Sequence, residues 1–159
     1  MNKEKKESPK REFISTVYVV NKNKVLLTFN KNVKKFIPLG GHIDPNELPC
    51  QAAIREAKEE SGYEIELLDL DGKTSLEKTN LKQNFDIQLD KIGEDHHHIN
   101  ISYIGKIVGG EMRKESDEGT ALKWFSKKEL KNIEKIFENT REKALKALKL
   151  TKNNQKGEQ

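Results

Sequence analysis

Three glutamates lie close together in one short stretch of the chain, at Glu56, Glu59 and Glu60. If this stretch is helical, their spacing of i, i+3 and i+4 places all three on one face. Carboxylates this close repel one another unless a cation lies among them. Hard divalent cations such as Mg²⁺ take oxygen ligands, commonly one or two carboxylates together with substrate phosphates. The spacing therefore indicates a magnesium-dependent phosphate site on a helix, with a solvated acidic face as the alternative in a chain that is 35% charged.

The residues on either side of these glutamates complete a longer pattern. Residues 41–62 read G-x5-E-x7-R-E-x-x-E-E-x-G, in which Glu47 and Arg55 are further fixed positions. This pattern resembles the signature of the Nudix hydrolase family at every fixed position. Two neighbouring positions depart mildly from it, because the family usually carries aliphatic residues where this chain has Ala57 and Tyr63.

The resemblance implies both a fold and an activity. The fold is α/β, the Nudix fold, an α/β/α sandwich with a mixed β-sheet in which a loop-helix-loop carries the pattern, called the Nudix box. The implied enzyme is a Nudix hydrolase that depends on Mg²⁺, or alternatively Mn²⁺, and cleaves the phosphoric anhydride bond of a nucleoside diphosphate linked to another moiety. We expect a nucleoside triphosphate, including an oxidised one, as the substrate. The alternatives are ADP-ribose, a nucleotide sugar, a dinucleoside polyphosphate, an RNA end, or a non-catalytic nucleotide-binding regulatory module.

The resemblance also assigns roles to single residues of the box. The implied metal ligands are one backbone carbonyl and three carboxylates, from Gly40, Glu56, Glu59 and Glu60. Glu56 is also a candidate for the base that activates water, and Glu59, Arg55 and Glu47 complete the catalytic group. We expect Arg55 to orient a neighbouring carboxylate through a bidentate pair. Glu47 is expected to support the loop or to coordinate the metal through water.

Two further contacts are expected around the box. Family members often add a carboxylate from a loop nearer the C-terminus, as a metal ligand or as the base, and Glu118 is the best match. Glu115 and Asp117 compete with it, and a solvated acidic turn is the alternative. Gly41 is expected to bind substrate, because a glycine lets a ligand approach the backbone closely.

Three consecutive histidines at residues 96–98 invite a transition-metal interpretation. Successive side chains of a strand alternate between its faces, so three in a row do not all reach one ion. Neither a cysteine partner nor an H-E-x-x-H spacing accompanies them. We therefore interpret the run as the polar start of a strand, with His96 or His98 facing the substrate, rather than as a dedicated metal site.

The elements that must position these residues follow from the apolar pattern. Strands are expected at residues 13–20, 24–29, 63–70, 85–89, 98–108 and 120–125, and Gly109 and Gly110 are expected to end the strand at 98–108. Residues 35–42 are expected to form a short strand that leads into a glycine-rich loop, with Pro38 at an edge or strand end. The helix of the box is expected to begin near Leu48, to be capped by Asp44 or Asn46, and to end at Gly62. A second helix is expected after Ser126, whose S-K-K-E sequence is a capping box. A last amphipathic helix is expected over about residues 133–148.

The length and composition bound the organisation of the chain. Its 159 residues suit one domain, placed at residues 12–150 between charged tails at 1–11 and 151–159 that are expected to be disordered. No apolar run reaches the roughly 20 residues of a membrane-spanning helix, and no signal-peptide pattern opens the chain. These features predict a cytoplasmic protein without a membrane partner.

The charge bears on the expected partners. The pI near 9.0 raises the question of nucleic acid, but lysines are spread along the whole chain and mixed with glutamates. A base-stacking surface would instead require clustered aromatic and basic residues. We therefore expect a small nucleotide as the partner and a solvated lysine surface rather than a nucleic-acid face. Dimers are common in the family, and the sequence leaves a homodimer open.

Overall fold

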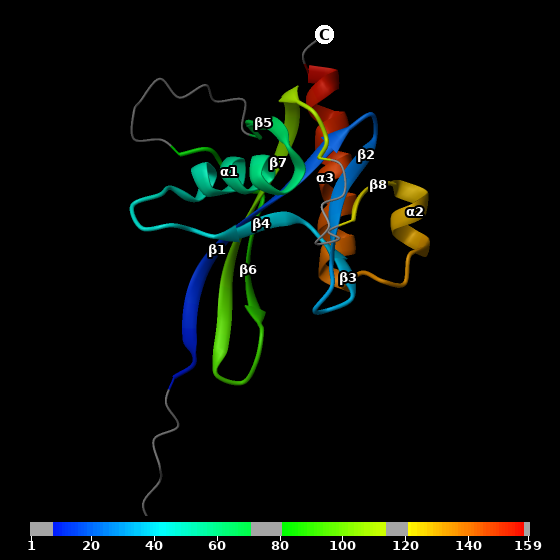
Figure 1. The fold of residues 1–159 in the computed structure, drawn as a ribbon. Coiled ribbons are helices and arrows are strands. Elements are labelled where there is room, and N and C mark those ends of the chain that lie inside the picture. The colour runs from blue at the N-terminus through cyan, green and yellow to red at the C-terminus, as the bar shows by residue number, and fades with distance from the viewer. Residues whose placement is uncertain (1–7, 71–80, 114–120, 158–159) are drawn as a thin grey trace, which may run out of the picture.

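A computed structural model of the protein describes residues 8–70, 81–113 and 121–157. Within these residues the chain folds into eight strands and three helices (Figure 1). In chain order they are β1 (Lys10–Asn21), β2 (Lys24–Asn30), β3 (Lys35–Ile37), β4 (Leu39–His42), α1 (Pro49–Ser61), β5 (Tyr63–Leu67), β6 (Asp86–Lys91), β7 (His96–Gly110), β8 (Leu122–Ser126), α2 (Lys127–Asn132) and α3 (Glu138–Gly157).

The strands form one mixed sheet with the central order β3-β2-β1-β7-β5. β1 and β7 run parallel, and the other strand pairs are antiparallel. On one edge, β1 pairs with β2 near its C-terminal end and with β4 over residues 14–17. On its other edge, β1 pairs with β7 in a register that sets Glu12 opposite His98. β4 therefore lies beside the middle of β1, and its last residue, His42, is opposite Ile14.

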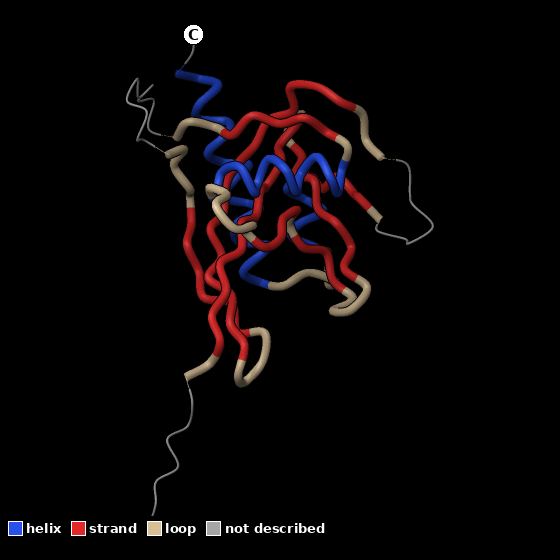
Figure 2. Tube along the Cα trace, turned by 60° about the vertical axis from the view of Figure 1, so that its left-hand side comes forward, coloured by secondary structure: helices blue, strands red, loops and turns tan. Residues whose placement is uncertain are grey.

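Apolar side chains cover both faces of the sheet because alternate residues of β1 point in opposite directions. Val17 and Val19 belong to a buried cluster that includes Ala53 and Ala57 of α1. Tyr18 belongs to a second cluster, which also holds residues of α2 and α3. Figure 2 shows α1 on one side of the strands and the other helices on the far side. The predicted α/β/α sandwich with a mixed sheet is therefore confirmed.

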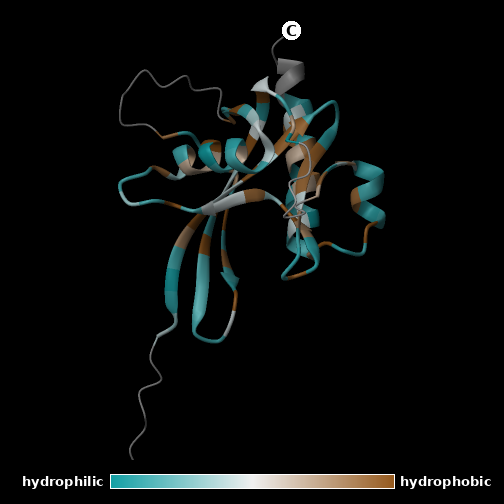
Figure 3. Ribbon diagram, in the orientation of Figure 1, coloured by the Kyte–Doolittle hydropathy of each residue, from teal (hydrophilic) through white to brown (hydrophobic). Residues whose placement is uncertain are grey.

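The N-terminal end of β1 extends beyond this core together with β6 and the beginning of β7. Figure 3 shows that these extended ends are mostly hydrophilic, whereas the strands between the helices are mostly apolar. Lys10 and Arg11, which we placed in a tail, belong to this extension because they pair with the first residues of β7. The sheet therefore begins two residues before the domain boundary expected at residue 12.

Residues 35–42, expected as a short strand that leads into a glycine-rich loop, form two short strands divided at Pro38, because the glycines belong to a strand of their own. Proline has no backbone N–H to donate to a sheet, so it falls between two short strands rather than inside one. β3 before it pairs with β2, and β4 after it pairs with β1. The other long strand, β7, continues through Gly109 and Gly110, where we expected a break, because β5 pairs with both glycines.

The last helix begins five residues later than expected, at Glu138 rather than near Ile133. Ile133 is the extended C-cap residue of α2, and Ile136 forms a β-bridge with Phe36. The side chain of Arg141 donates to the carbonyl of Ile133 at 2.8 Å, which holds this connection in a non-helical path. At its other end α3 continues to Gly157, seven residues past the expected boundary at 150.

No helix in the described ranges combines the length and the apolar character needed to cross a membrane.

Candidate active site

Helix α1 is positioned by its two ends and by a face of small residues. Leu48 is its N-cap residue, and Pro49 occupies the first turn, where a missing N–H costs nothing. The Leu48 N–H donates to the side chain of Gln51 at 2.9 Å, so neither Asp44 nor Asn46 caps the helix as expected. Gly62 ends the helix in the left-handed conformation, as predicted. The fully buried alanines Ala52, Ala53 and Ala57 let α1 lie close against the sheet.

Arg55 is the centre of the polar network on α1. Its Nε and Nη2 donate to the two carboxylate oxygens of Glu47 at 2.8 and 2.9 Å, which makes a bidentate pair. Its Nη1 donates to Glu56 at 2.8 Å and to Glu59 at 3.2 Å. Nη2 also donates to the backbone carbonyl of His42 at 3.1 Å. One guanidinium therefore joins three carboxylates of the Nudix box to the end of β4.

Glu47 closes the loop that leads into α1. One of its oxygens accepts the backbone N–H of Asp44 at 3.0 Å in addition to the pair with Arg55. The Arg55 guanidinium holds the pKa of Glu47 below its ordinary value, and Glu47 and Glu56 in turn raise the pKa of Arg55. Both groups thus stay charged, and Glu47 is placed as a support of the loop.

Glu60 differs from the other carboxylates because it lies deeper, under the glycine strand. Its Oε2 accepts the backbone N–H of Gly40 at 3.2 Å. Burial, as the largest cause, raises the pKa of Glu60 to about 7, with the hydrogen bond from the Gly40 N–H opposing this shift and the nearby charges of Glu56 and Glu59 adding to it. A cation among these carboxylates would favour the ionised form of Glu60.

Two glycines of β4 allow the strand to approach its neighbours closely. A Cβ on Gly40 would lie 2.7 Å from the Cα of Thr16, and Gly40 has a φ of 152°. A Cβ on Gly41 would lie 2.7 Å from the Cδ of Glu56. Gly41, which we expected to bind substrate, is thus in contact with a carboxylate of the box. Gly40 contributes its N–H to Glu60, and its role as a carbonyl ligand stays a prediction.

The carboxylates of Glu56, Glu59 and Glu60 share the face of α1 on which Arg55 and the glycine strand meet. Their donors are all hard oxygens, the ligands that Mg²⁺ and similar divalent cations prefer. Because burial and the charges of Glu56 and Glu59 raise the pKa of Glu60, a cation at this face would stabilise its ionised form. The residues present therefore fit a divalent cation.

A pocket of about 480 Å³ adjoins the N-terminal end of α1. It is lined by Glu12, Phe13, His42, Ile43, Glu47, Pro49 and Ile101. Glu47 and His42 also belong to the network of Arg55, so the pocket opens beside the box. The candidate residues Glu118, Glu115 and Asp117 lie outside the described residues.

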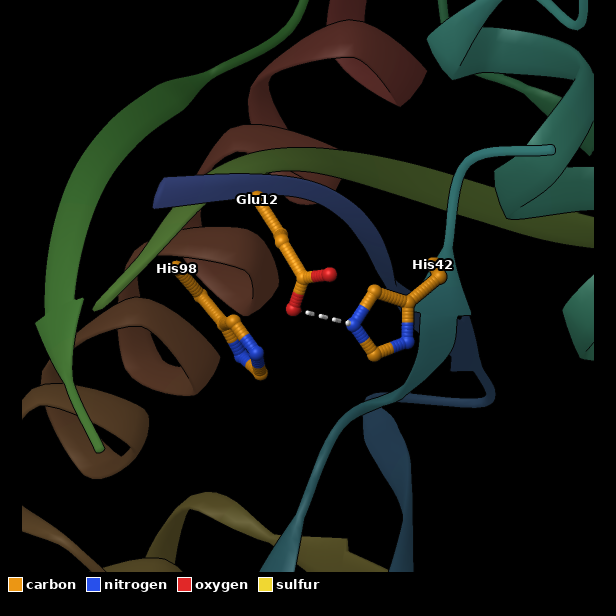
Figure 4. Close-up of side chains that lie close together, drawn as sticks. All are labelled: Glu12, His42 and His98. Atoms are coloured by element: carbon orange, nitrogen blue, oxygen red, sulfur yellow. Dashed lines mark ion pairs between the residues drawn. The ribbon is translucent and has the colours of Figure 1, made fainter. Parts of the chain in front are cut away.

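A second polar cluster gathers on the opposite face of the sheet around Glu12. Its Oε2 lies 2.6 Å from Nε2 of His96 and 3.5 Å from Nε2 of His42. The ring of His98 lies 5.1 Å from that of His42 and 4.8 Å from that of His96, between centroids. Figure 4 shows Glu12, His42 and His98 converging from three strands.

The side chains of the three histidines alternate between the faces of β7 as expected, but the residues that contact them were not predicted. His97 points to the other side of the strand and is buried, while His96 and His98 share one face. Burial lowers the pKa of His98, and the nearby His42 and His96 lower it further. Glu12 and His42 did not emerge as candidates, because only the strand register brings them to His98.

The family model for the NUDIX domain matches residues 10–148. The chain belongs to the Nudix hydrolase family. The predicted Nudix fold and the predicted enzyme class are therefore confirmed.

Relatives of known structure support this membership. A Nudix-family hydrolase from Clostridium perfringens is 38% identical, with a TM-score of 0.74 over 89% of this chain and 99% of the other. A MutT Nudix hydrolase from Burkholderia pseudomallei shares the fold at 19% identity, with a TM-score of 0.63 over 89% and 98% of the two chains.

A curated relative carries a more specific name. It is a protein of Bacillus subtilis (strain 168) named, provisionally, as an 8-oxo-dGTP diphosphatase. The two sequences are 31% identical over 111 residues, which make up 69% of this chain and 63% of the relative. The match thus spans less than two thirds of the length of the relative.

Proposed function

We propose that this Nudix hydrolase uses Mg²⁺, with Mn²⁺ as an alternative, to hydrolyse a nucleoside triphosphate in the cytoplasm, with an oxidised one such as 8-oxo-dGTP as the preferred substrate. The observation that carries the proposal is the set of box carboxylates: Arg55 binds Glu47, Glu56 and Glu59, while Glu60 on the same helix accepts a hydrogen bond from Gly40. The relative named for 8-oxo-dGTP supports the substrate class. Neighbours named for ADP-ribose or for UDP derivatives are at most 19% identical, so they bear on the fold alone.

Three carboxylates and a loop carbonyl would hold the cation in this proposal, from Glu56, Glu59, Glu60 and Gly40. When bound, Mg²⁺ neutralises phosphate charge and lowers the pKa of a water molecule. The remaining steps belong to the protein. Glu60 is already held by the Gly40 N–H, so the position of this carboxylate relative to the glycine strand is set before a substrate arrives.

Glu56 is the proposed base for the attacking water. One of its oxygens accepts a hydrogen bond from Arg55, which orients the carboxylate and leaves the second oxygen to take a proton. Arg55 acts here as a positioning residue, because it also holds Glu47 and the carbonyl of His42. We place the nucleotide in the pocket beside Glu47, with its phosphates toward the box.

A substrate screen with purified protein and Mg²⁺ tests the proposal. The panel contains 8-oxo-dGTP, dGTP and other triphosphates, ADP-ribose, a nucleotide sugar, a dinucleoside polyphosphate and 5′-triphosphate RNA, with products separated by chromatography. We expect the highest kcat/KM for a triphosphate, with release of the nucleoside monophosphate and pyrophosphate.

The screen also contains the outcomes that would contradict the proposal. A higher kcat/KM for ADP-ribose or for RNA would replace the substrate class. Nucleotide binding without turnover of any compound would favour a regulatory module. Omission of divalent cations should stop turnover, and activity that persists in a chelator would refute the proposed cation dependence.

A further inference from the structure

The cluster around Glu12 brings metal-ligating atoms together from three strands. Glu12 of β1, His42 of β4 and His98 of β7 each offer one ligand atom, and these atoms lie within 4.8 Å of one another (Figure 4). Within this group, Oε2 of Glu12 lies 3.5 Å from Nε2 of His42. All three side chains lie on the sheet face opposite α1, because Glu12 is in register with His98 and His42 with Ile14.

The donor set differs in kind from that of the Nudix box. Imidazole nitrogens suit zinc, copper, iron and nickel, whereas Mg²⁺ takes oxygen ligands. Two histidines and one carboxylate are also a known ligand set for zinc, with the fourth position left open to water or substrate. The chemistry of this cluster therefore selects a transition metal over the cation of the box.

One member of the cluster carries a polar atom that the rest of the described chain leaves unsatisfied. Nε2 of His98 is buried and accepts or donates no hydrogen bond within the described residues. Buried polar atoms are normally hydrogen-bonded, so each exception calls for a partner. A neutral imidazole nitrogen without a hydrogen-bond partner can offer its lone pair to an ion.

Neighbouring groups hold two of the three ligands in place. His96 lies with Nε2 at 2.6 Å from the same oxygen of Glu12, and a metal-bound carboxylate commonly has such an outer hydrogen-bond partner. The backbone of His42 is held by Arg55, which donates to its carbonyl at 3.1 Å. The cluster therefore has supporting contacts as well as ligands.

The three ligand atoms, all within 4.8 Å of one another, must move closer together to hold an ion. With metal–ligand distances of about 2.0–2.1 Å, tetrahedral ligands lie roughly 3.4 Å apart. The Glu12 to His42 distance of 3.5 Å already meets this value. The side chain of His42 is 59% exposed, so its rotation is not opposed by packing.

We propose that Glu12, His42 and His98 form a binding site for a divalent transition-metal ion of the Zn²⁺ class, separate from the Nudix box. The three side chains lie on the sheet face opposite α1, whereas the pocket of about 480 Å³, which Glu12 and His42 help to line, adjoins the N-terminal end of α1. With three ligands from the protein, a fourth position of such an ion would be left to water.

Metal binding by the full chain without nucleotide tests this site. Zn²⁺ binding is measured by calorimetry in saturating Mg²⁺, and Co²⁺ binding by its visible absorption, which reports ligand geometry. We expect one ion per chain at this site. Each of Glu12→Gln, His42→Gln and His98→Gln should weaken Zn²⁺ binding by more than about 100-fold, beyond the range for outer partners, and abolish the Co²⁺ spectrum.

Two matched variants separate this site from its neighbours. Glu59→Gln removes a carboxylate of the box, and His97→Gln removes the histidine that faces the other side of β7; circular dichroism confirms that each variant is folded. Both should bind Zn²⁺ as the wild type does.

Two outcomes would overturn the site, and the first is a wild-type protein that does not bind Zn²⁺. The second is Zn²⁺ binding that persists in His98→Gln and is lost in Glu59→Gln, because this result would place the ion in the Nudix box. Because no nucleotide is present, these results do not depend on the proposed hydrolysis.

Discussion

The two polar clusters of this protein meet at β4, and they are built in opposite ways. Gly41 faces α1 and contacts Glu56, while the next residue, His42, turns its side chain to the other face of the sheet. The first cluster consists of carboxylates around one guanidinium. The second consists of imidazoles around one carboxylate, Glu12. The same short strand therefore separates a site for a hard cation from a site suited to a softer one.

The clusters also differ in how far apart their residues lie in the chain. The carboxylate cluster comes from a single loop and helix, within residues 40–60. The histidine cluster comes from three strands, and Glu12 and His98 are 86 positions apart in the sequence. A site within one helix depends on helical spacing, whereas a site across strands depends on the register of the whole sheet. Mutations should therefore affect the two clusters independently.

The largest expected effect follows from removing a carboxylate of the box. Glu59→Gln keeps the shape of an exposed side chain but removes its charge, so the fold should persist. We expect Mg²⁺-dependent kcat/KM to fall by about 10²–10³-fold, the size seen when a group that stabilises transition-state charge is lost. Steady-state hydrolysis of the best triphosphate from the screen measures this fall.

Glu64→Gln is the matched control for Glu59→Gln. Glu64 lies on β5 and pairs with Lys58 at the surface, so this variant should retain activity. Turnover by Glu59→Gln equal to wild type would remove Glu59 from the site.

A substitution on β4 tests whether the carboxylate cluster depends on close packing. The Cβ of Gly41→Ala would meet Cδ of Glu56 at 2.7 Å, so this flexible side chain must move away. A misplacement of about 1 Å can lower the rate by about 10²-fold, and we expect a fall in kcat of this size with a nearly unchanged Tm.

Gly40→Ala is the contrasting variant on the same strand. Its Cβ would meet the backbone of Thr16 at 2.7 Å, and alanine does not favour the φ of 152°, so the Tm itself should fall. Activity assays and thermal melts of both variants make the comparison. If Gly41→Ala lowers the Tm as much as Gly40→Ala, then Gly41 supports the fold rather than the position of Glu56.

The contrast between the clusters explains which features could be predicted from the sequence. Alternating apolar residues indicated the strands, and the spacing of Glu56, Glu59 and Glu60 indicated the helix that carries them. Both are local signals. The start of α3 was wrong because it depends on tertiary contacts, the bridge of Ile136 to Phe36 and the hydrogen bonds of Arg141. The partners of the histidines could not be predicted for the same reason, since pairing register is a property of the whole sheet.

A smaller effect should follow from replacing the guanidinium at the centre of the box. Arg55→Lys keeps the positive charge but loses the fork that binds both oxygens of Glu47. Outer partners of metal ligands typically contribute about 10–100-fold to affinity or activity, and we expect a loss in this range.

The dependence on Mg²⁺ distinguishes positioning from a general loss of structure in Arg55→Lys. If Arg55 orients Glu56 and Glu59, the Mg²⁺ concentration for half-maximal activity should rise. Lys58→Arg, an exposed change on the same helix, is the control and should leave it unchanged. A lower Tm with an unchanged Mg²⁺ requirement would show that Arg55 stabilises the loop without acting on the ligands.

The smallest effect concerns the outer partner in the histidine cluster. His96 contacts Oε2 of Glu12 at 2.6 Å but does not belong to the group of three ligand atoms. His96→Gln should therefore weaken Zn²⁺ binding only about tenfold, less than the loss of a ligand such as His98. Calorimetry with Zn²⁺ in saturating Mg²⁺ measures this difference.

The sign of a second substitution separates orientation from charge in this cluster. Lys10 contacts the other oxygen of Glu12 at 2.7 Å, and its side chain is 71% exposed. Removing this positive charge in Lys10→Gln should strengthen Zn²⁺ binding slightly, because a cation near the site repels the ion. His96→Gln and Lys10→Gln should thus shift the affinity in opposite directions. Equal losses in His96→Gln and His98→Gln would make His96 a ligand, and weakening by Lys10→Gln would show that Lys10, rather than His96, orients the carboxylate.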